Sequence, residues 1–426
     1  MKLSWPHVRE YLQAHRRWGI VALLFFIALI NNLDRQTLSV LAPTLREKFG
    51  FGAVEYSYVV ASFLAAYAIG YTFCGAVLDR IGVKLGLAIA LGFWSLAGMF
   101  HAAAAGWISL AVLRFLLGLG ESFNSPAGVK AIAEWVPLRE RGLSMAVFSN
   151  GNIFGAMLAP PLVAFLTLHF GWRWGFIVTG ALGLVLLVVW WRNYESPETH
   201  PRLSAGERAV ILQDRAAATP IGTEARLGMW QLLRHPACAA FFVARLLTDP
   251  VSYFFNFWLL DYLQQSRGFS LAVIGLVGWL PFLASDIGGP GGGAMSDWLV
   301  RRGWPAARAR RTLMLGAACV MPLALLAVRT ESAWLAVGLI GVVLAGQTCW
   351  MANQLTLISE SVSRQNVAKL LALSALGGSL GGVVSTLVAG RLIDSAGYVA
   401  VFTGLGFLHL TAYGVLALGL RGKRSA

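Results

Sequence analysis

Four charged residues interrupt apolar stretches of the sequence and are the first candidates for chemistry. Asp34 and Arg35 stand side by side in LINNLDRQTLSVLAP, directly after an apolar run. Arg114 and Glu121 lie seven residues apart in a second apolar stretch. Charged side chains at membrane depth are costly, and where they occur they commonly line a substrate or ion path.

The spacing of these residues suggests how they work together. Asp34 and Arg35 point about 100° apart on a helix, so neither can fully neutralise the other. Arg114 and Glu121 are two helical turns apart and share one face. Two arginines can bind a carboxylate through charge-assisted hydrogen bonds, and two buried carboxylates can carry protons. The alternative is a buried ion-pair network that only orders the helices. A helix bundle with no transport role would, however, be more stable with apolar residues in place of these charges.

The composition places these residues in a helical membrane protein. Of 426 residues, 57% are hydrophobic and 13% are charged, and the mean hydropathy is +0.66. A soluble domain carries about a quarter charged residues. Apolar stretches of membrane-spanning length recur along the whole chain. We expect an all-α membrane protein with twelve spans, at residues 18–41, 54–78, 85–105, 107–130, 143–168, 174–191, 237–262, 271–296, 312–328, 333–358, 366–390 and 398–420.

The 34 Lys and Arg residues are distributed unevenly over the expected loops. The terminal tails and even-numbered loops hold 25 of them, when Lys130 and Lys369 near the span ends are counted with the adjoining loops, whereas the odd-numbered loops hold six. The positive-inside rule then places both termini in the cytoplasm, with the protein in the cell inner membrane. Topology and contact with anionic lipid headgroups explain the net charge of +14, so nucleic acid is not an expected partner.

The chain divides into two similar halves. A polar stretch at 192–236, with an amphipathic piece near 205–216, separates residues 1–191 from residues 237–426. GAVLDRIGVK, which begins at Gly75, is repeated in the second half as GAMSDWLVRR, which contains Asp297. A parallel repeat of two six-helix bundles places a substrate site near the middle of the membrane.

The sequence resembles the major facilitator superfamily, and within it the hexuronate-transporter branch of the anion:cation symporter family. The resemblance extends from about Trp18 to about Leu420. GAVLDRIGVK resembles the superfamily's loop between the second and third helices. The more specific segments are NNLDRQTLSVLAPTL, RFLLGLGESFNSPAGVKAIAEWVP, LLTDPVSYFFNFWLLDYL, GLVGWLPFLASDIGGPGGGAMSDWLVRRG and GQTCWMANQLTLISE.

This resemblance implies roles for individual residues. Asp34 and Glu121 would handle coupling protons, and Arg35 and Arg114 would contact an organic anion. Tyr67 matches a substrate-contacting tyrosine of the family. Asn152 stands where relatives often have a glutamine that contacts sugar hydroxyls.

The second half offers further polar candidates. Gln347, Trp350 and Asn353 follow one another at three-residue intervals, so they share a broad helix face. Amides and a flat ring suit the hydroxyls and the C–H face of a sugar acid. Tyr253 and Asn256 are similar candidates. Hydrogen bonding between helices is the alternative use of such side chains.

Other features are expected to be structural. Arg245 and Asp249, four residues apart, can neutralise each other on one helix, and a role in gating is the alternative. GGPGGG at 288–293 lacks the Gly-Lys-Ser/Thr ending of a phosphate loop. Its glycines, like those of GGSLGGVVSTLVAG at 377–390, are expected to allow close helix approach or bending. No metal site or cofactor is expected, and the cysteines are interpreted as packing thiols. The repeated loops are expected to gate the cytoplasmic side through Gly75, Asp79, Arg80, Lys84 and Asp297.

Three positions depart from the family's pattern. Asn32 replaces a tyrosine, Ser125 replaces a phenylalanine, and Asp261 stands where a basic residue is usual. The first two remove aromatic surface near the proposed site and the third reverses a charge, so the substrate is harder to assign than the fold.

The residues and the resemblance together predict a monomeric proton-coupled symporter for a small sugar acid, favouring a hexuronate, that works by alternating access. Another organic anion, such as a hexonate, an aldarate or an aromatic acid, is the alternative substrate. A sensor of the same fold that does not transport is a second alternative. A membrane-embedded enzyme would need a nucleophile–base or metal constellation, and the sequence offers none.

Overall fold

The computed structural model describes residues 16–217, 229–362 and 364–420, and within them it contains helices and no β-strand. Residues 1–15 and 421–426, which make up most of the terminal tails used to assign sidedness, lie outside the described residues. The α-helices are α2 (Arg16–Phe49), α3 (Ala53–Phe100), α4 (Trp107–Glu121), α5 (Asn124–Trp135), α6 (Leu138–Phe170), α7 (Trp172–Asn193), α8 (Ala205–Ala217), α9 (Met229–Arg234), α10 (Pro236–Gln265), α11 (Leu271–Val277), α12 (Leu280–Arg301), α13 (Ala306–Val320), α14 (Leu323–Arg329), α15 (Ala333–Ser359) and α16 (Arg364–Gly419).

Nine helical segments among the described residues are long and apolar enough to cross a membrane. Two helices are far longer than one crossing needs, because α3 has 48 residues and α16 has 56. At about 1.5 Å per residue, each exceeds twice the hydrocarbon thickness of about 30 Å. Each is interrupted by a glycine of positive φ, at Gly82 (79°) and Gly397 (71°). The chain is thus a multi-pass membrane protein, and the count of twelve spans stays a prediction.

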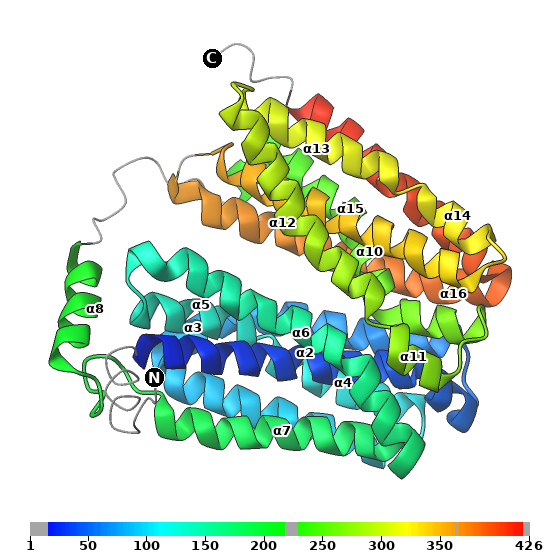
Figure 1. Ribbon diagram of the computed structural model, residues 1–426, viewed down its shortest axis with the longest axis horizontal. Helices are drawn as coiled ribbons and strands as arrows, with labels where there is room; N and C mark the ends of the chain where they lie inside the picture. The colour runs from blue at the N-terminus through cyan, green and yellow to red at the C-terminus, as the bar shows by residue number, and fades with distance from the viewer. Residues whose placement is uncertain (1–15, 218–228, 363, 421–426) are drawn as a thin grey trace, which may run out of the picture. The chain divides into compact units, whose positions relative to one another are not determined.

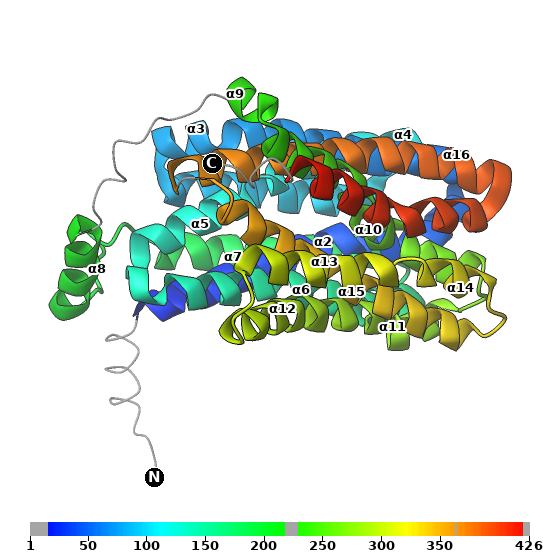
Figure 2. The same cartoon turned by 90° about the horizontal axis from the view of Figure 1, so that it is seen from above.

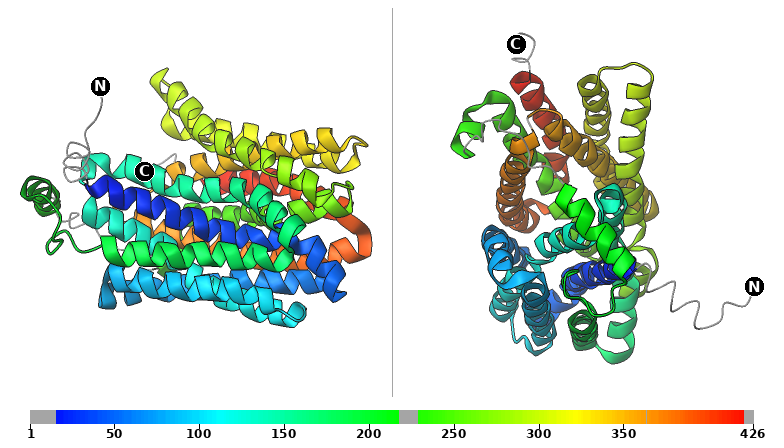
Figure 3. Two further views of the ribbon diagram at one scale, coloured as in Figure 1. Left: turned by 60° about the horizontal axis from the view of Figure 1, so that its bottom comes forward. Right: turned by 90° about the vertical axis from the view of Figure 1, so that its left-hand side faces the viewer.

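The chain forms two compact units. The first comprises residues 1–38 and 65–220, and the second comprises residues 39–64 and 221–426. The division falls inside the central polar stretch, but α2 and α3 each contribute to both units. Within each unit the long helices run side by side, as the end-on view in Figure 3 shows.

Glycines bring the helices of the first unit into close contact. A Cβ atom at Gly151 or Gly155 of α6 would lie 2.3 Å from a backbone oxygen of α2, that of Phe25 or Leu29 respectively. Without a strong hydrophobic force between helices in lipid, small residues allow the backbone approach that stabilises packing. This contact fixes α2, which carries Asp34 and Arg35, against α6.

Glycines also bring the helices of the second unit into close contact, in the glycine-rich segments 288–293 and 377–390. In α12, a Cβ at Gly288 would lie 2.2 Å from the Ala345 oxygen of α15. In α16, a Cβ at Gly381 would lie 2.2 Å from the Leu246 oxygen of α10. Figures 1 and 2 show α12 beside α15 and α16 along α10. The expectation that these glycines allow close helix approach is confirmed.

The central stretch carries the predicted amphipathic helix, α8. Glu207 in its first turn is buried and accepts hydrogen bonds from the backbone N–H groups of Arg16 and Arg17, at 3.1 Å each. A carboxylate at a helix N-terminus satisfies donors that have no partner within the helix. Glu207 therefore attaches α8 to the beginning of α2. Residues 218–228 of this stretch lie outside the described residues.

Candidate functional site

An ion pair joins α2 to α4 in the first unit. Both Nη2 and Nε of Arg35 donate to Oε2 of Glu121, at 2.8 and 3.1 Å. The Glu121 side chain is fully buried, whereas 24% of the Arg35 side chain is exposed. Because only the arginine retains exposure, it is the member of the pair that a ligand can reach.

Arg114 lies directly behind this pair. Its side chain is buried, and its Nη2 donates to the backbone oxygen of Arg35 at 3.0 Å. Arg114 and Glu121 both face the interior from α4, as their spacing of two turns predicts. A second guanidinium next to the backbone of Arg35 raises the positive charge density at the exposed arginine.

Asp34 points to another part of the same unit. Its side chain is 3% exposed, and within the described part of the chain neither carboxylate oxygen has a hydrogen-bond partner of standard geometry. It lies beside Thr179 of α7 and next to Gly98 of α3, where a Cβ would be 3.9 Å from the carboxylate carbon. Asp34 and Arg35 are thus not paired with each other, in agreement with their divergence on the helix.

Tyr67 completes this cluster. The Arg35 guanidinium carbon lies 5.1 Å from the centre of the Tyr67 ring, which is in the range of a cation–π contact. The Tyr67 ring also stacks on Tyr71, with centroids 6.1 Å apart. We refer to Asp34, Arg35, Tyr67, Arg114 and Glu121 together as the charged cluster.

Asn152 touches α2 through its backbone. Its carbonyl oxygen accepts a hydrogen bond from the Asn32 side chain. Asn32, where the family pattern has a tyrosine, therefore has a packing role between α2 and α6. This contact does not engage the Asn152 side-chain amide.

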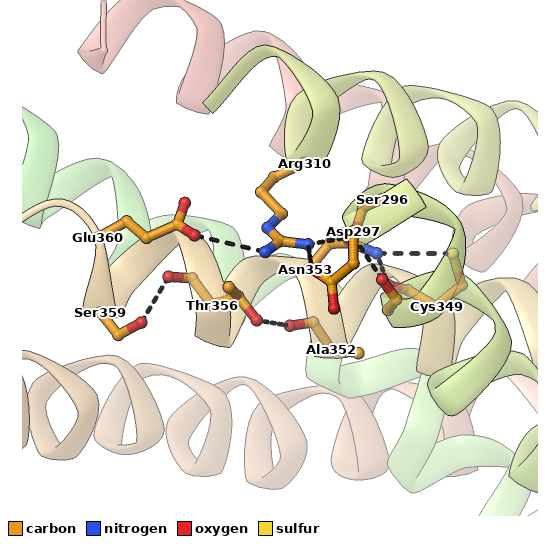
Figure 4. A network of polar contacts seen from close by, with 10 residues as sticks. Ser296, Asp297, Arg310, Cys349, Ala352, Asn353, Thr356, Ser359 and Glu360 are labelled. Carbon is orange, nitrogen blue, oxygen red and sulfur yellow. Dashed lines mark hydrogen bonds and ion pairs between the residues drawn. The ribbon is translucent and has the colours of Figure 1, made fainter. Parts of the chain in front are cut away.

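In the second unit, Gln347 of α15 is buried and faces α10. Its Nε2 donates to Ser252 Oγ at 2.6 Å and to the Thr248 oxygen at 3.3 Å. Asn353 donates to the Cys349 oxygen at 2.9 Å, one turn earlier on its own helix (Figure 4). Gln347 thus joins α15 to α10 and Asn353 bonds within α15, while Oε1 of Gln347 and Oδ1 of Asn353 have no partner among the described residues.

Trp350 is enclosed in a hydrophobic core. Its side chain is 0% exposed, it packs edge-on against His409 at 5.1 Å, and its indole N–H donates to Gln354 Oε1 at 2.8 Å. Although Gln347, Trp350 and Asn353 share a broad helix face by spacing, the structure encloses the indole ring. Stacking on a sugar would require α15 to move.

The candidates on α10 are partly buried. Tyr253 stacks on Phe257, with centroids 6.4 Å apart, and lies against Gly382 of α16, where a Cβ would be 2.4 Å from its ring. Asn256 donates to the Ser252 oxygen at 2.8 Å. Earlier in α10, the predicted Arg245–Asp249 pair is confirmed at 2.5 Å.

The repeated loop residues have their recorded partners inside their own units. Asp79 pairs with Lys130 at 2.6 Å in the first unit. In the second unit, Arg310 pairs with Asp297 at 2.6 Å and with Glu360 at 3.4 Å (Figure 4).

The remaining motif residues lie around the first of these loops. The Lys84 ammonium pairs with Glu195 and lies over the Trp191 ring. Nothing lies within 4 Å of a Cβ added at Gly75, and Arg80 is exposed.

Two polar groups were not singled out from the sequence. Ser252, which binds Gln347, is an ordinary serine in an aromatic-rich segment, and no sequence signal marks it. Asp286 of α12 has a buried Oδ2 with no hydrogen-bond partner among the described residues. Its position inside an apolar stretch, the signal that identified Asp34, would have found it.

Comparisons with known proteins agree with this architecture. A family model described as Major Facilitator Superfamily matches residues 24–365. The galacturonate transporter of Dickeya chrysanthemi is 35% identical over 279 residues, covering 66% of this chain and 81% of that protein. The hexuronate transporter of Escherichia coli K12 is 29% identical over 411 residues, covering 96% and 94%.

Among solved structures, a D-xylose–proton symporter superimposes with a TM-score of 0.72 at 17% identity, covering 93% of this chain and 97% of that one. At this identity the likeness concerns the fold. The family match covers most of the chain, and the family and the curated relatives are transporters rather than enzymes. The chain is therefore a membrane transporter that belongs to the Major Facilitator Superfamily.

Proposed function

We propose that this transporter is a proton-coupled symporter for a small sugar acid, and we favour a hexuronate as its substrate. The observation that carries the proposal is the Arg35–Glu121 pair, in which a partly exposed guanidinium is bound to a fully buried carboxylate. The names of the galacturonate and hexuronate transporters support the substrate class.

The pair provides a way to exchange one carboxylate for another. Protonation of Glu121 would remove the negative charge that compensates Arg35, and a substrate carboxylate could then replace it. Arginine suits this exchange because its planar fork can bind carboxylates with two hydrogen bonds. Arg114 adds positive charge without offering an exposed surface.

Asp34 is proposed as a second proton site. An ionised carboxylate buried without hydrogen-bond donors is costly, and protonation avoids that cost. Among the described residues, neither oxygen has a charged partner or a hydrogen bond of standard geometry, and Thr179 is the hydroxyl beside it, which supports a protonated Asp34 in this conformation. Proton loss on one side of the membrane would then favour rearrangement of the buried charges.

The sugar hydroxyls are assigned to the polar groups outside the ion pair. Tyr67, next to Arg35, is the best placed. The side chains of Asn152, Gln347 and Asn353 offer amide groups, and Tyr253 and Asn256 are further candidates. Trp350 is a candidate only for a conformation in which its ring is uncovered, because here it is fully buried.

The topology is proposed on the basis of charge and helix length. Twelve spans form two six-helix bundles, residues 1–191 and 237–426, joined by the cytoplasmic stretch 192–236. Both termini lie in the cytoplasm, the protein resides in the cell inner membrane as a monomer, and the repeated loops gate its cytoplasmic side.

Uptake into proteoliposomes tests this function. Galacturonate and glucuronate should accumulate inside vesicles when an imposed pH gradient drives protons inward, and an uncoupler should abolish the accumulation. Glucose should not compete, because it has no carboxylate for Arg35. Equal competition by glucose would contradict the sugar-acid assignment.

A wider competitor panel separates the alternatives. Preference for galactonate, galactarate or benzoate over the hexuronates would assign a different organic anion. Binding of a sugar acid, seen as a raised melting temperature, without any counterflow would identify a sensor instead.

A further inference from the structure

Residues 39–64 connect to the first unit in sequence but pack in the second. The first part of α2, up to residue 38, belongs to the first unit, and the remainder of the helix belongs to the second. The same change occurs in α3 after residue 64. The segment that contains Arg46 thus continues directly into the helices that carry the charged cluster.

A buried ion pair holds this segment to α10. Arg46 Nη1 lies 2.6 Å from Asp261 Oδ2, and the Asp261 side chain is 0% exposed. Tyr398 of α16 donates its hydroxyl to the same carboxylate oxygen at 2.5 Å. A buried carboxylate that loses its counter-ion is strongly destabilised, so separation of this pair is costly.

Further hydrogen bonds connect the segment to α10. Ser39 Oγ donates to the Asn256 oxygen at 3.0 Å, and the Tyr56 hydroxyl donates to the Phe257 oxygen at 2.9 Å. The Tyr56 ring also packs edge-on against Trp258, with centroids 4.8 Å apart.

The segment is also bound to α16. The Asp394 carboxylate accepts hydrogen bonds from the backbone N–H groups of Ala53 and Val54, at 3.1 and 3.2 Å. These donors belong to the first turn of α3, which has no partners for them within the helix. Close packing accompanies this cap, because a Cβ at Gly390 would lie 2.5 Å from the Ser57 side chain.

We propose that Arg46, Asp261 and Tyr398 form a latch that closes one end of the transport path. The proposal rests on the alternating access of the proposed function. To open this end, residues 39–64 must leave α10 and α16, and the buried Arg46–Asp261 ion pair must then separate. The latch therefore determines how readily the transporter leaves the conformation described here.

Asp261 is the residue on which this latch depends. Its carboxylate oxygen Oδ2 binds both the Arg46 guanidinium and the Tyr398 hydroxyl, so one buried group joins residues 39–64, α10 and α16.

Distance measurements between spin labels test the latch in the purified, full-length protein. Labels at the exposed residues Glu47 and Ser266 report on the separation of the segment from α10. The native cysteines are first replaced, and the labelled protein must retain its helix content and melting behaviour. Asp261→Asn should raise the population of a longer distance at least about tenfold, because it removes the charge that binds Arg46.

Two further variants show whether the contacts of Asp261 with Arg46 and Tyr398 are responsible for the change in distance. The exchanged pair Arg46→Asp with Asp261→Arg should restore the short distance, and Tyr398→Phe should produce a smaller shift than Asp261→Asn. Arg267→Gln is the matched control. Arg267 is another cation near the end of α10, and its recorded bonds go to Tyr262, Ala327 and Thr330 rather than to residues 39–64.

The label distances test the latch independently of any transport assay. An unchanged distance distribution in Asp261→Asn, or an equal change in Arg267→Gln, would overturn the latch. If Asp261→Asn fails to fold, an unchanged distribution in Tyr398→Phe would overturn it instead. Failure of sugar-acid uptake in the unsubstituted protein would contradict the proposed function while leaving the label distances as an independent result.

Discussion

At the scale of single residues, the charged cluster divides two carboxylates between two different environments. Glu121 is bound to Arg35 at 2.8 Å, whereas Asp34, one position from Arg35 in the chain, has no ion-pair partner in the part of the chain that the structure describes. In the proposed function, Glu121 would give up Arg35 to a substrate anion when it is protonated, and Asp34 would be a second proton site. Substitutions can distinguish these two roles.

Asp34→Asn should leave the protein stable and able to bind the anion, because asparagine approximates the protonated acid in size and polarity. Coupled transport should be lost, since the amide cannot release a proton. Melting temperature and ligand binding are measured alongside gradient-driven uptake. A collapse of stability would show instead that the charge of Asp34 has a structural role, worth several kcal/mol in a buried ion pair.

Arg114→Lys should weaken sugar-acid binding by about tenfold or more, because lysine keeps the charge but lacks the planar fork that reaches the Arg35 oxygen. Arg173→Lys is the matched control, as Arg173 donates to the Ala102 oxygen away from the cluster. Titration calorimetry measures both variants. Equal affinity in Arg114→Lys and the unsubstituted protein would exclude a role for the planar guanidinium in sugar-acid binding.

At the scale of elements, small residues and capping groups decide where the charged residues lie. The α2 helix is held by the glycines of α6 on one side and by Glu207 of α8 at its beginning. These contacts do not touch the charged cluster, but they set the position of the helix that carries Asp34 and Arg35. Their effects should therefore appear in stability.

Gly151→Ala should lower the melting temperature, because its Cβ would lie 2.3 Å from the Phe25 oxygen. Gly142→Ala in the same helix is the control, since nothing lies within 4 Å of its added Cβ. Alanine favours helix by up to about 1 kcal/mol over glycine, so the control should be neutral or stabilised. Equal melting temperatures for the two variants would contradict the close α2–α6 contact.

Acid should loosen the attachment of the α8 segment through His200. The imidazole is buried, and its Nδ1 accepts a hydrogen bond from the Arg202 N–H at 3.1 Å. Burial first, and the Arg16 guanidinium second, lower the pKa of His200 below its usual 6.5. The folded arrangement thus favours neutral histidine, so its contribution is present above about pH 6.5 and is lost as the pH falls.

Hydrogen exchange of residues 200–213 measures this effect. Exchange, corrected for its intrinsic pH dependence, should be faster at pH 5.5 than at pH 7.5, and His200→Gln should remove the difference. The same corrected exchange at both pH values in the unsubstituted protein would contradict the assigned role of His200.

At the scale of the whole molecule, hydropathy and charge predicted a helical membrane transporter, and the family match agrees. The isolated charges Asp34, Arg35, Arg114 and Glu121 were visible because an apolar background makes each charge conspicuous. The Arg35–Glu121 and Arg46–Asp261 partners were not predictable, since they are 86 and 215 residues apart in the chain. The burial of Trp350 likewise depends on packing around α15 and not on its own spacing.

The end of α2 was also not predictable from hydropathy. Its predicted span ends at residue 41, but the helix continues through Pro43 to Phe49 and brings Arg46 to Asp261. Hydropathy detects the part of a helix that lies in lipid, whereas the polar end depends on contacts made after folding. Arg46 was therefore counted as a loop charge in the sequence.

The most direct test of the central claim compares two modes of transport by Glu121→Gln in proteoliposomes. If Glu121 couples protons to sugar-acid transport, the variant should exchange labelled galacturonate across the membrane but should not accumulate it in response to a pH gradient. The unsubstituted protein should do both. Accumulation by Glu121→Gln equal to that of the unsubstituted protein would contradict the account, because a glutamine at this position cannot carry the proton.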